Sequence, residues 1–533
     1  MKTILSIRIR HFVYSSLAML GCISCNPESL TEMNRDVNRI DEVIPEFMFT
    51  GALLDLPQDS YTVLAQGMQY FSTYKEVAGV GDKYYSFNGT EAPFFFYTGT
   101  TVDNIWIGKL NRLYQIRGEL ERQAESGVDN TNKLALIRIL RVYFYHQLTD
   151  VAGDIPYFEA QLGETGTLSP KYDTQREIYE DLLNELDEAA SALNEASPSF
   201  GSADLFYNGD VLRWKKFAYT LMLRLGMRLT RADESLARTW VQRAIAGGVM
   251  SAESDMAYIT YASTPGSLNY KINGYINGNY NTPGGDNVEG GKYAATFINH
   301  LKNTNDPRLP VLSVVWVRNT DGSYRADNSV AAQRGMVNGS LNTYPSDFDS
   351  YSEPSRLYLN NTSPIIILGP AEAQLLLAEA AIRGWYNGTS AEAAYNQGVT
   401  FAMKQWALWP DVAPHSGRIS DQQISNYLQS NPFLSAGSFE AQFAQINTQK
   451  WVSLFGDDYE VFANWRRTNY PQLMPVNYPG NVTGGQMFRR FSIPLNENLT
   501  NKANYLEALQ RQGFSEFTGD NLTTRVWWDK NEQ

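Results

Sequence analysis

Apolar residues recur every three or four positions along most of this chain, which is the spacing of one face of an α-helix. The repeat is clear in "NKLALIRILRVYFYHQLTDVAG" (132–153). It also occupies 172–196, 210–232, 233–248, 369–385 and 389–408, and we expect a further pair near 45–76 and 102–126. Consecutive helices joined by short turns stack as antiparallel neighbours. The pattern therefore predicts an all-α fold with a scaffold of tetratricopeptide-like helix pairs.

Residues that favour helix ends flank several of these segments. Asp173 and Asp233 stand where two of the helices would begin, and a short acidic side chain there accepts bonds from free backbone N–H groups. Gly247–Gly248 would end the second of these helices. Pro370 stands near the start of a later helix, where its fixed φ is tolerated. These residues set the predicted boundaries.

Two regions interrupt the helical repeat. Residues 77–101 ("VAGVGDKYYSFNGTEAPFFFYTGTT") and the longer stretch 256–365 are rich in Gly, Asn, Tyr and Ser. Loops of this length inside a compact domain are usually functional or disordered. We therefore predict one helical domain over 45–533, in which 256–365 is a long irregular insertion packed on the scaffold.

The tyrosines of these two regions are the predicted ligand contacts. Aromatic rings stack on the apolar faces of sugars, and neighbouring polar groups bond the hydroxyls. The candidates are Tyr84, Tyr85, Tyr97, Tyr270, Tyr275 and Tyr280. The alternative for Tyr275 and Tyr280 is structural: their rings would hold a Gly-rich loop on the scaffold.

The first residues have the layout of a secretory signal peptide. Basic residues precede a short apolar run that ends in "LGCISC", and the run is too short to span a membrane. Both cysteines of the chain lie here, as in a bacterial lipobox whose cysteine receives lipid. We predict a signal peptide over 1–24, a lipidated Cys25 with Cys22 as the alternative, and a tether over 25–44. Two or three acyl chains suffice to anchor a protein to a membrane.

Charge and motif content argue against several functions. The formal net charge is −13, which disfavours nucleic acid as a partner. Among the four histidines, His146 lies on an aromatic helix face and is expected to be packed, and HExxH, GxSxG, P-loop and GxGxxG motifs do not occur. "TDGSYRADN" (320–328) is only loosely like a calcium loop, so we expect a polar turn there. We predict no catalytic residues, no metal site and no cofactor.

Ordered motifs along the chain resemble a known family. They are "CNPESLTEMNRDVN", "RVYFYHQLTDVAGDIPY", "YDTQREIYEDLLNELDEA", "DPRLP", "AEAQLLLAEAAIRGWYNG", "QKWVSLFGDDYEVFANWRRTNYPQL" and "TRVWWDK". Together they resemble the SusD/RagB nutrient-binding outer-membrane lipoproteins of Bacteroidetes, and especially the branch called SusD-like family 2. The resemblance extends from about residue 20 to about residue 530.

The resemblance implies a function as well as a fold. It implies a non-catalytic lipoprotein on the outer face of the outer membrane. There the protein would bind an oligosaccharide or a peptide as the lid of a SusC-like TonB-dependent transporter. The resemblance does not decide between two roles for Arg466 and Arg467. They would either form buried ion pairs, a structural role that we favour, or lie near the partner. The alternative is a surface glycan hydrolase or adhesin that acts without a transporter.

Overall fold

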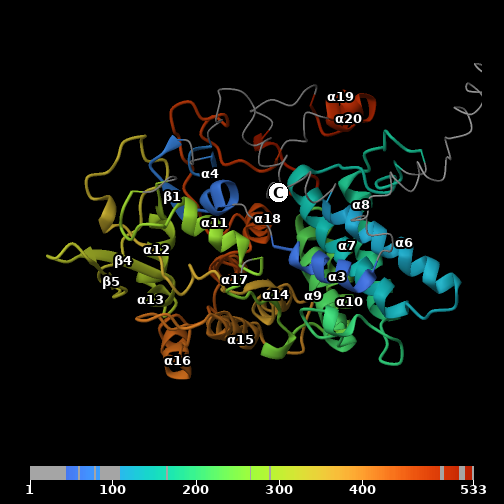
Figure 1. Cartoon of the computed structure of the whole chain (residues 1–533), viewed down its shortest axis with the longest axis horizontal. Helices are drawn as coiled ribbons and strands as arrows, with labels where there is room; N and C mark the ends of the chain where they lie inside the picture. The colour runs from blue at the N-terminus through green and yellow to red at the C-terminus, as the bar shows by residue number, and fades with distance from the viewer. Residues whose placement is uncertain are drawn as a thin grey trace, which may run out of the picture. The chain divides into compact units, whose positions relative to one another are not determined.

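Helices form most of the described chain (Figure 1). The computed structural model describes residues 44–57, 61–76, 80–84, 108–163, 166–264, 266–286, 290–491, 497–514 and 522–530. Cys22, Cys25, Tyr85 and Tyr97 lie outside these residues, as do the predicted signal peptide and tether. The described residues from Pro45 onward form one compact unit.

The helices pack mostly against their neighbours in sequence, which confirms the predicted helix-pair scaffold. In the first half, α3, α6, α7, α8, α9 and α10 pack successively, and in the second half α14 packs on α15 and α17, and α17 on α18 (Figure 1). The bounds are α3 Pro45–Leu54, α6 Asn111–Glu125, α7 Thr131–Ala152, α8 Gln175–Ala192, α9 Val211–Arg228, α10 Glu234–Gly247, α14 Pro370–Ile382, α15 Ala391–Lys404, α16 Asp421–Ser430, α17 Phe439–Ser453, α18 Asp458–Thr468, α19 Glu497–Thr500 and α20 Lys502–Arg511.

Two predicted helix boundaries differ from the structure. The N-cap of α8 is Thr174, whose side chain forms a capping box with Glu177, and Asp173 instead accepts bonds from the backbone N–H groups of Tyr157 and Phe158 at 3.0 and 2.8 Å. Helix α3 covers only the start of 45–76, which continues as a π-helical turn at Tyr61–Ala65 and strand β1 at Phe71–Thr73. Asp233 caps α10 as predicted, and Gly248 ends it with φ 94°.

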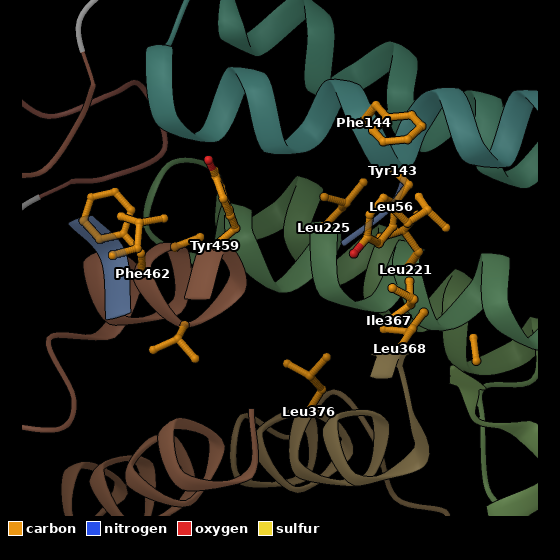
Figure 2. Close-up of a cluster of buried hydrophobic side chains, with 14 of the residues drawn as sticks. Leu56, Tyr143, Phe144, Leu221, Leu225, Ile367, Leu368, Leu376, Tyr459 and Phe462 are labelled. Atoms are coloured by element: carbon orange, nitrogen blue, oxygen red, sulfur yellow. The ribbon is translucent and has the colours of Figure 1, made fainter. Parts of the chain in front are cut away.

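The apolar faces of these helices meet in one large core. Tyr143 and Phe144 of α7, Leu221 and Leu225 of α9, and Leu376 of α14 take part in the cluster that Figure 2 shows. Each large apolar side chain that folding removes from water contributes about 1.5–3 kcal/mol. This core is what fixes the helix pairs relative to one another.

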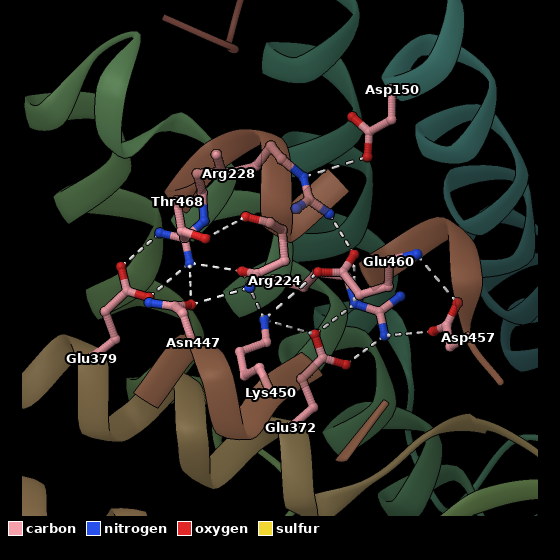
Figure 3. Close-up of polar contacts among 12 residues, drawn as sticks. Asp150, Arg224, Arg228, Glu372, Glu379, Asn447, Lys450, Asp457, Glu460 and Thr468 are labelled. Carbon is pink, nitrogen blue, oxygen red and sulfur yellow. Dashed lines mark hydrogen bonds and ion pairs between the residues drawn. The ribbon is translucent and has the colours of Figure 1, made fainter. Parts of the chain in front are cut away.

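A network of buried ion pairs crosses the same helices (Figure 3). Arg224 of α9 bonds Glu372 of α14, with Nε to Oε1 at 3.0 Å, and Arg228 bonds Glu460 of α18. Lys450 of α17 lies 3.5 Å from Glu372. Charges this deeply buried are tolerated only when they are paired. We call the ion pairs of Arg224, Arg228 and Lys450, together with that of Arg467, the scaffold network.

The two arginines that the motif "NWRRTNYP" supplies are both buried, and Arg467 forms the buried ion pair that we favoured, whereas Arg466 bonds backbone oxygens. Arg467 donates to both carboxylate oxygens of Glu379 at 2.6 and 2.7 Å. Arg466 donates to the backbone oxygens of Asp150 and Arg489 at 2.6 and 2.8 Å. Arg467 therefore ties α18 to α14, and Arg466 ties α18 to the end of α7.

The insertion 256–365 has more regular structure than the sequence indicated. It contains α11 Tyr270–Gly278, α12 Ala295–Asn303, α13 Leu309–Leu312 and the strands β2 Ala257–Ile259, β3 Gly291–Tyr293, β4 Ser313–Arg318, β5 Tyr324–Asp327 and β6 Glu353–Pro354. The named strands of the described residues pair antiparallel: β1 with β3, β2 with β7 Ile365–Leu368, and β4 between β5 and β6. Elements this short do not complete enough periods to give a pattern.

Candidate functional site

A hairpin of the insertion presents two aromatic rings on one face. Strands β4 and β5 pair with Trp316 opposite Ala326 and with Arg318 opposite Tyr324. Alternate residues of a strand point to the same side, so Trp316 and Tyr324 share a face. Tyr324 is 37% exposed. The polar turn predicted over 320–328 occupies only the start of that segment, because Tyr324–Asp327 forms β5. Asn319–Ser323 connects the strands, and the Asp321 carboxylate accepts bonds from the Ser323 backbone N–H and hydroxyl.

A second aromatic pair and an acid lie beside this hairpin. Tyr344 is 50% exposed, and its ring centroid is 5.6 Å from that of Tyr74 in an edge-to-face contact. The Tyr74 hydroxyl donates to Asp286 at 2.8 Å, and Lys75 lies 3.1 Å from the same carboxylate. We call Trp316, Tyr324, Tyr344 and Asp286 the insertion surface, and the buried Tyr74 packs against Tyr344.

Several observations place these residues close together. A Cβ added to Gly284 would lie 3.2 Å from the Cβ of Trp316 and 3.6 Å from a ring carbon of Tyr324. Partial burial raises the pKa of Tyr344. The nearby carboxylates of Asp286 and Asp349 raise this pKa further, and so does the neighbouring Tyr324. The 282–286 turn therefore brings Asp286 and both half-exposed tyrosines to one side of the hairpin.

The chemistry of this surface suits a neutral polyhydroxylated ligand. Exposed aromatic faces can stack on apolar C–H groups. The carboxylate of Asp286, which is 45% exposed, can accept hydrogen bonds from hydroxyl groups. Arg356 supports Trp316 from one side, with its guanidinium 5.3 Å from the ring centroid. The surface thus combines fixed aromatic rings with a solvent-accessible acceptor.

Most of the predicted tyrosines occupy other positions. Tyr84, Tyr275 and Tyr280 are buried. Tyr84 packs edge-on against Phe488, and the rings of Tyr275 and Tyr61 are 4.8 Å apart. The hydroxyls of Tyr280 and Tyr61 are 3.0 Å apart, so these side chains attach α11 and the following turn to the scaffold. The structural alternative thus describes their packing, and their role in ligand binding stays a prediction.

Of the four predicted tyrosines that the structure describes, Tyr270 alone is exposed. Its side chain is 49% exposed at the start of α11, and its hydroxyl donates to the backbone oxygen of Pro57 at 2.5 Å. Sequence reasoning missed Trp316, Tyr324 and Tyr344. The alternation of aromatic and polar residues around the Asp-Gly turn was the available signal for the first two, because such alternation predicts a half-exposed hairpin.

The described histidines are buried or partly buried. Among the described residues there is no group of three or more His, Cys, Asp or Glu side chains placed to hold a metal ion. His146 is packed as predicted, and burial with the nearby arginines lowers its pKa to about 3. Burial also lowers the pKa of His300 and of His415. The helices of the described residues include none that is both long and apolar enough to cross a bilayer.

Comparison with solved structures finds close likeness over nearly the whole chain. A chitin-binding protein superposes with a TM-score of 0.75 at 27% identity, over 92% of this chain and 100% of that one. A chitin-binding SusD homologue from Flavobacterium johnsoniae gives 0.70 at 24% identity, over 91% and 98% of the two chains. A SusD homologue from Bacteroides fragilis gives 0.74 at 21% identity, over 92% and 100%. The Flavobacterium johnsoniae and Bacteroides fragilis proteins have the same fold as this chain.

The sequence itself matches one family. No curated protein sequence matches the chain. The family SusD-like 2, described as "Starch-binding associating with outer membrane", matches residues 37–494. A match over this much of the chain, together with the helix-pair scaffold, shows the family. The chain belongs to the SusD-like 2 family of nutrient-binding proteins that associate with the outer membrane.

Proposed function

We propose that this protein binds an oligosaccharide at the insertion surface and does not chemically alter it. The observation that carries the proposal is the half-exposed Tyr344 and Tyr324 beside Trp316 and the accessible carboxylate of Asp286. Rings held by packing contacts lose little conformational freedom on binding. Membership of a nutrient-binding family supports the same conclusion.

Chitin oligosaccharides are the first ligands to test. The similar structure at 27% identity is that of a chitin-binding protein, whereas the family description refers to starch. Titration calorimetry with chitin oligosaccharides, maltooligosaccharides and short peptides would rank the three classes. Binding of either sugar supports the proposal. Binding of peptides alone would contradict it, and release of shortened sugars on incubation would favour the hydrolase alternative.

We further propose that the protein is the lipid-anchored lid of a SusC-like TonB-dependent transporter at the cell surface. The lipobox-like start and the family support this role. Tagged protein purified from mildly solubilised outer membrane should bring a large β-barrel protein with it in near-equal amount. Recovery of the lipoprotein alone would contradict the lid role and favour an adhesin.

The anchor can be tested separately from the partner. We propose Cys25 as the lipidated residue, followed by a tether over 25–44. Cys25→Ser should move the protein from the membrane fraction to the soluble fraction and stop incorporation of labelled fatty acid, while Cys22→Ser is the matched control. The opposite result would assign the lipid to Cys22. Protease accessibility on intact cells would then test display at the surface.

A further inference from the structure

A cavity lies between the scaffold and the insertion, apart from the insertion surface. It has a volume of about 60 Å³ and lies between strand β7, the start of α14, the turn after α17 and the 3-10 helix Gln405–Leu408. Because a cavity needs about 10–15 Å³ to hold one water, this cavity would hold roughly four waters or a small organic group. Its lining includes Ile365, Ile367, Trp409, Ser453 and Asp457.

Two hydrogen-bonding groups in this lining have no partner. Trp409 is 7% exposed and Ser453 is 5% exposed, and neither the Trp409 Nε1 nor the Ser453 Oγ is hydrogen-bonded. A buried donor left without a partner costs about 1–3 kcal/mol. Most buried polar groups are satisfied by protein or by ordered water, so two such donors in one cavity make it suited to a group that accepts hydrogen bonds.

The charged groups of the lining already have partners. Lys271 Nζ donates to the backbone oxygen of Gly456 at 2.9 Å and lies 3.6 Å from Asp458. Arg224 is paired with Glu372 and lies 3.5 Å from Asp457. The lining therefore contains two cations and two acids, and their formal charges cancel. A charged ligand would disturb these pairs, whereas a neutral ligand would not.

The remaining wall is largely apolar. Pro364, Ile365 and Ile367 line the cavity, and Ile365 is partly exposed. The cavity thus offers an apolar contact and two donors.

We infer that this cavity binds a small neutral amide, in which the carbonyl oxygen accepts from Trp409 and Ser453 and a methyl group contacts Ile365 and Ile367. An acetamido group fits both the volume and the polarity. Such a group could belong to an N-acetylated sugar or to a free small amide. The inference does not rest on the proposed function, because none of the insertion-surface residues lines this cavity.

The test compares ligands that differ only in the acetamido group. N-acetylglucosamine and glucose, with acetamide as the minimal probe, would be titrated against the mature protein by saturation-transfer NMR and calorimetry. Acetamide should bind, and N-acetylglucosamine should bind more tightly than glucose. Trp409→Phe keeps the ring but removes the donor, and it should weaken binding about fivefold, as expected for one hydrogen bond. Ser453→Ala should do the same.

Control variants separate this cavity from other sites. Ser235→Ala removes an exposed hydroxyl on α10 and should leave binding unchanged, as should Phe47→Ala, which removes an exposed ring on α3. Equal binding of glucose and N-acetylglucosamine would overturn the inference. So would binding of acetamide that is lost in Tyr344→Ala but kept in Trp409→Phe, or a crystal soaked in acetamide whose cavity holds water alone.

Discussion

The scaffold network and the insertion surface are built from similar polar and aromatic side chains, but their surroundings differ. In the scaffold network, Arg467 and Glu379 are buried and held by paired hydrogen bonds between α14 and α18. On the insertion surface, Tyr344 and Asp286 keep about half of their side chains exposed. The comparison teaches that burial decides whether such groups stabilise the fold or remain available to a ligand. Four variants test this division, from the largest expected effect to the smallest.

Removing one charge from the scaffold network should cost the most stability. Glu379→Gln leaves Arg467 buried without its carboxylate, and a broken buried pair costs about 3–5 kcal/mol in the free energy of unfolding. Urea unfolding monitored by circular dichroism measures the loss. The control is Glu121→Gln, which breaks the exposed Arg117–Glu121 pair and should cost less than about 0.5 kcal/mol. Similar losses in both variants would contradict the comparison.

The pH dependence of the scaffold should reveal its buried histidine. Burial lowers the pKa of His146 to about 3, so the unfolded chain takes up a proton below pH 6.5 that the folded chain excludes. The stability contributed by neutral His146 is present above pH 6.5 and is lost as the pH falls towards 3. Between pH 7 and pH 5, wild type should lose about 2 kcal/mol more than His146→Gln does. Parallel stability curves for the two proteins would refute this.

On the insertion surface, removing a ring should change binding rather than stability. Tyr344→Ala should weaken oligosaccharide binding roughly fivefold, corresponding to about 1 kcal/mol from one aromatic contact, with little change in melting temperature. Phe47→Ala removes a highly exposed ring on α3 and should leave binding unchanged. Calorimetry and thermal melts of both variants distinguish a binding surface from a scaffold contact. Unaltered affinity in Tyr344→Ala would remove this ring from the site.

The buried tyrosines of the insertion provide the smallest and sharpest test. Tyr280→Phe keeps the ring but removes the hydroxyl that lies 3.0 Å from that of Tyr61. If the side chain is structural, stability should fall by about 0.5–1.5 kcal/mol while oligosaccharide affinity stays the same. A fall in affinity without a fall in stability would instead place Tyr280 in the ligand site.

The sequence alone determined the helical scaffold and the family. Helices with a long apolar repeat, such as α7 and α9, lie within a few residues of their predicted bounds, because the repeat and the helix cap are local properties. Asp233 caps α10 as expected. The error at Asp173 arose because Asp173 and Thr174 both suit an N-cap, and contacts with the distant Tyr157 backbone decided between them.

The tertiary structure alone decided which aromatic and polar groups are accessible. Tyr280 and Tyr344 lie in similar Gly- and Asn-containing stretches, yet one is buried and the other is half exposed. Trp409 and Ser453 are 44 positions apart and share a cavity only because α15 and α17 pack together. Exposure depends on contacts between residues far apart in the chain, which no local pattern encodes, whereas helix periodicity depends on near neighbours and is therefore readable from sequence.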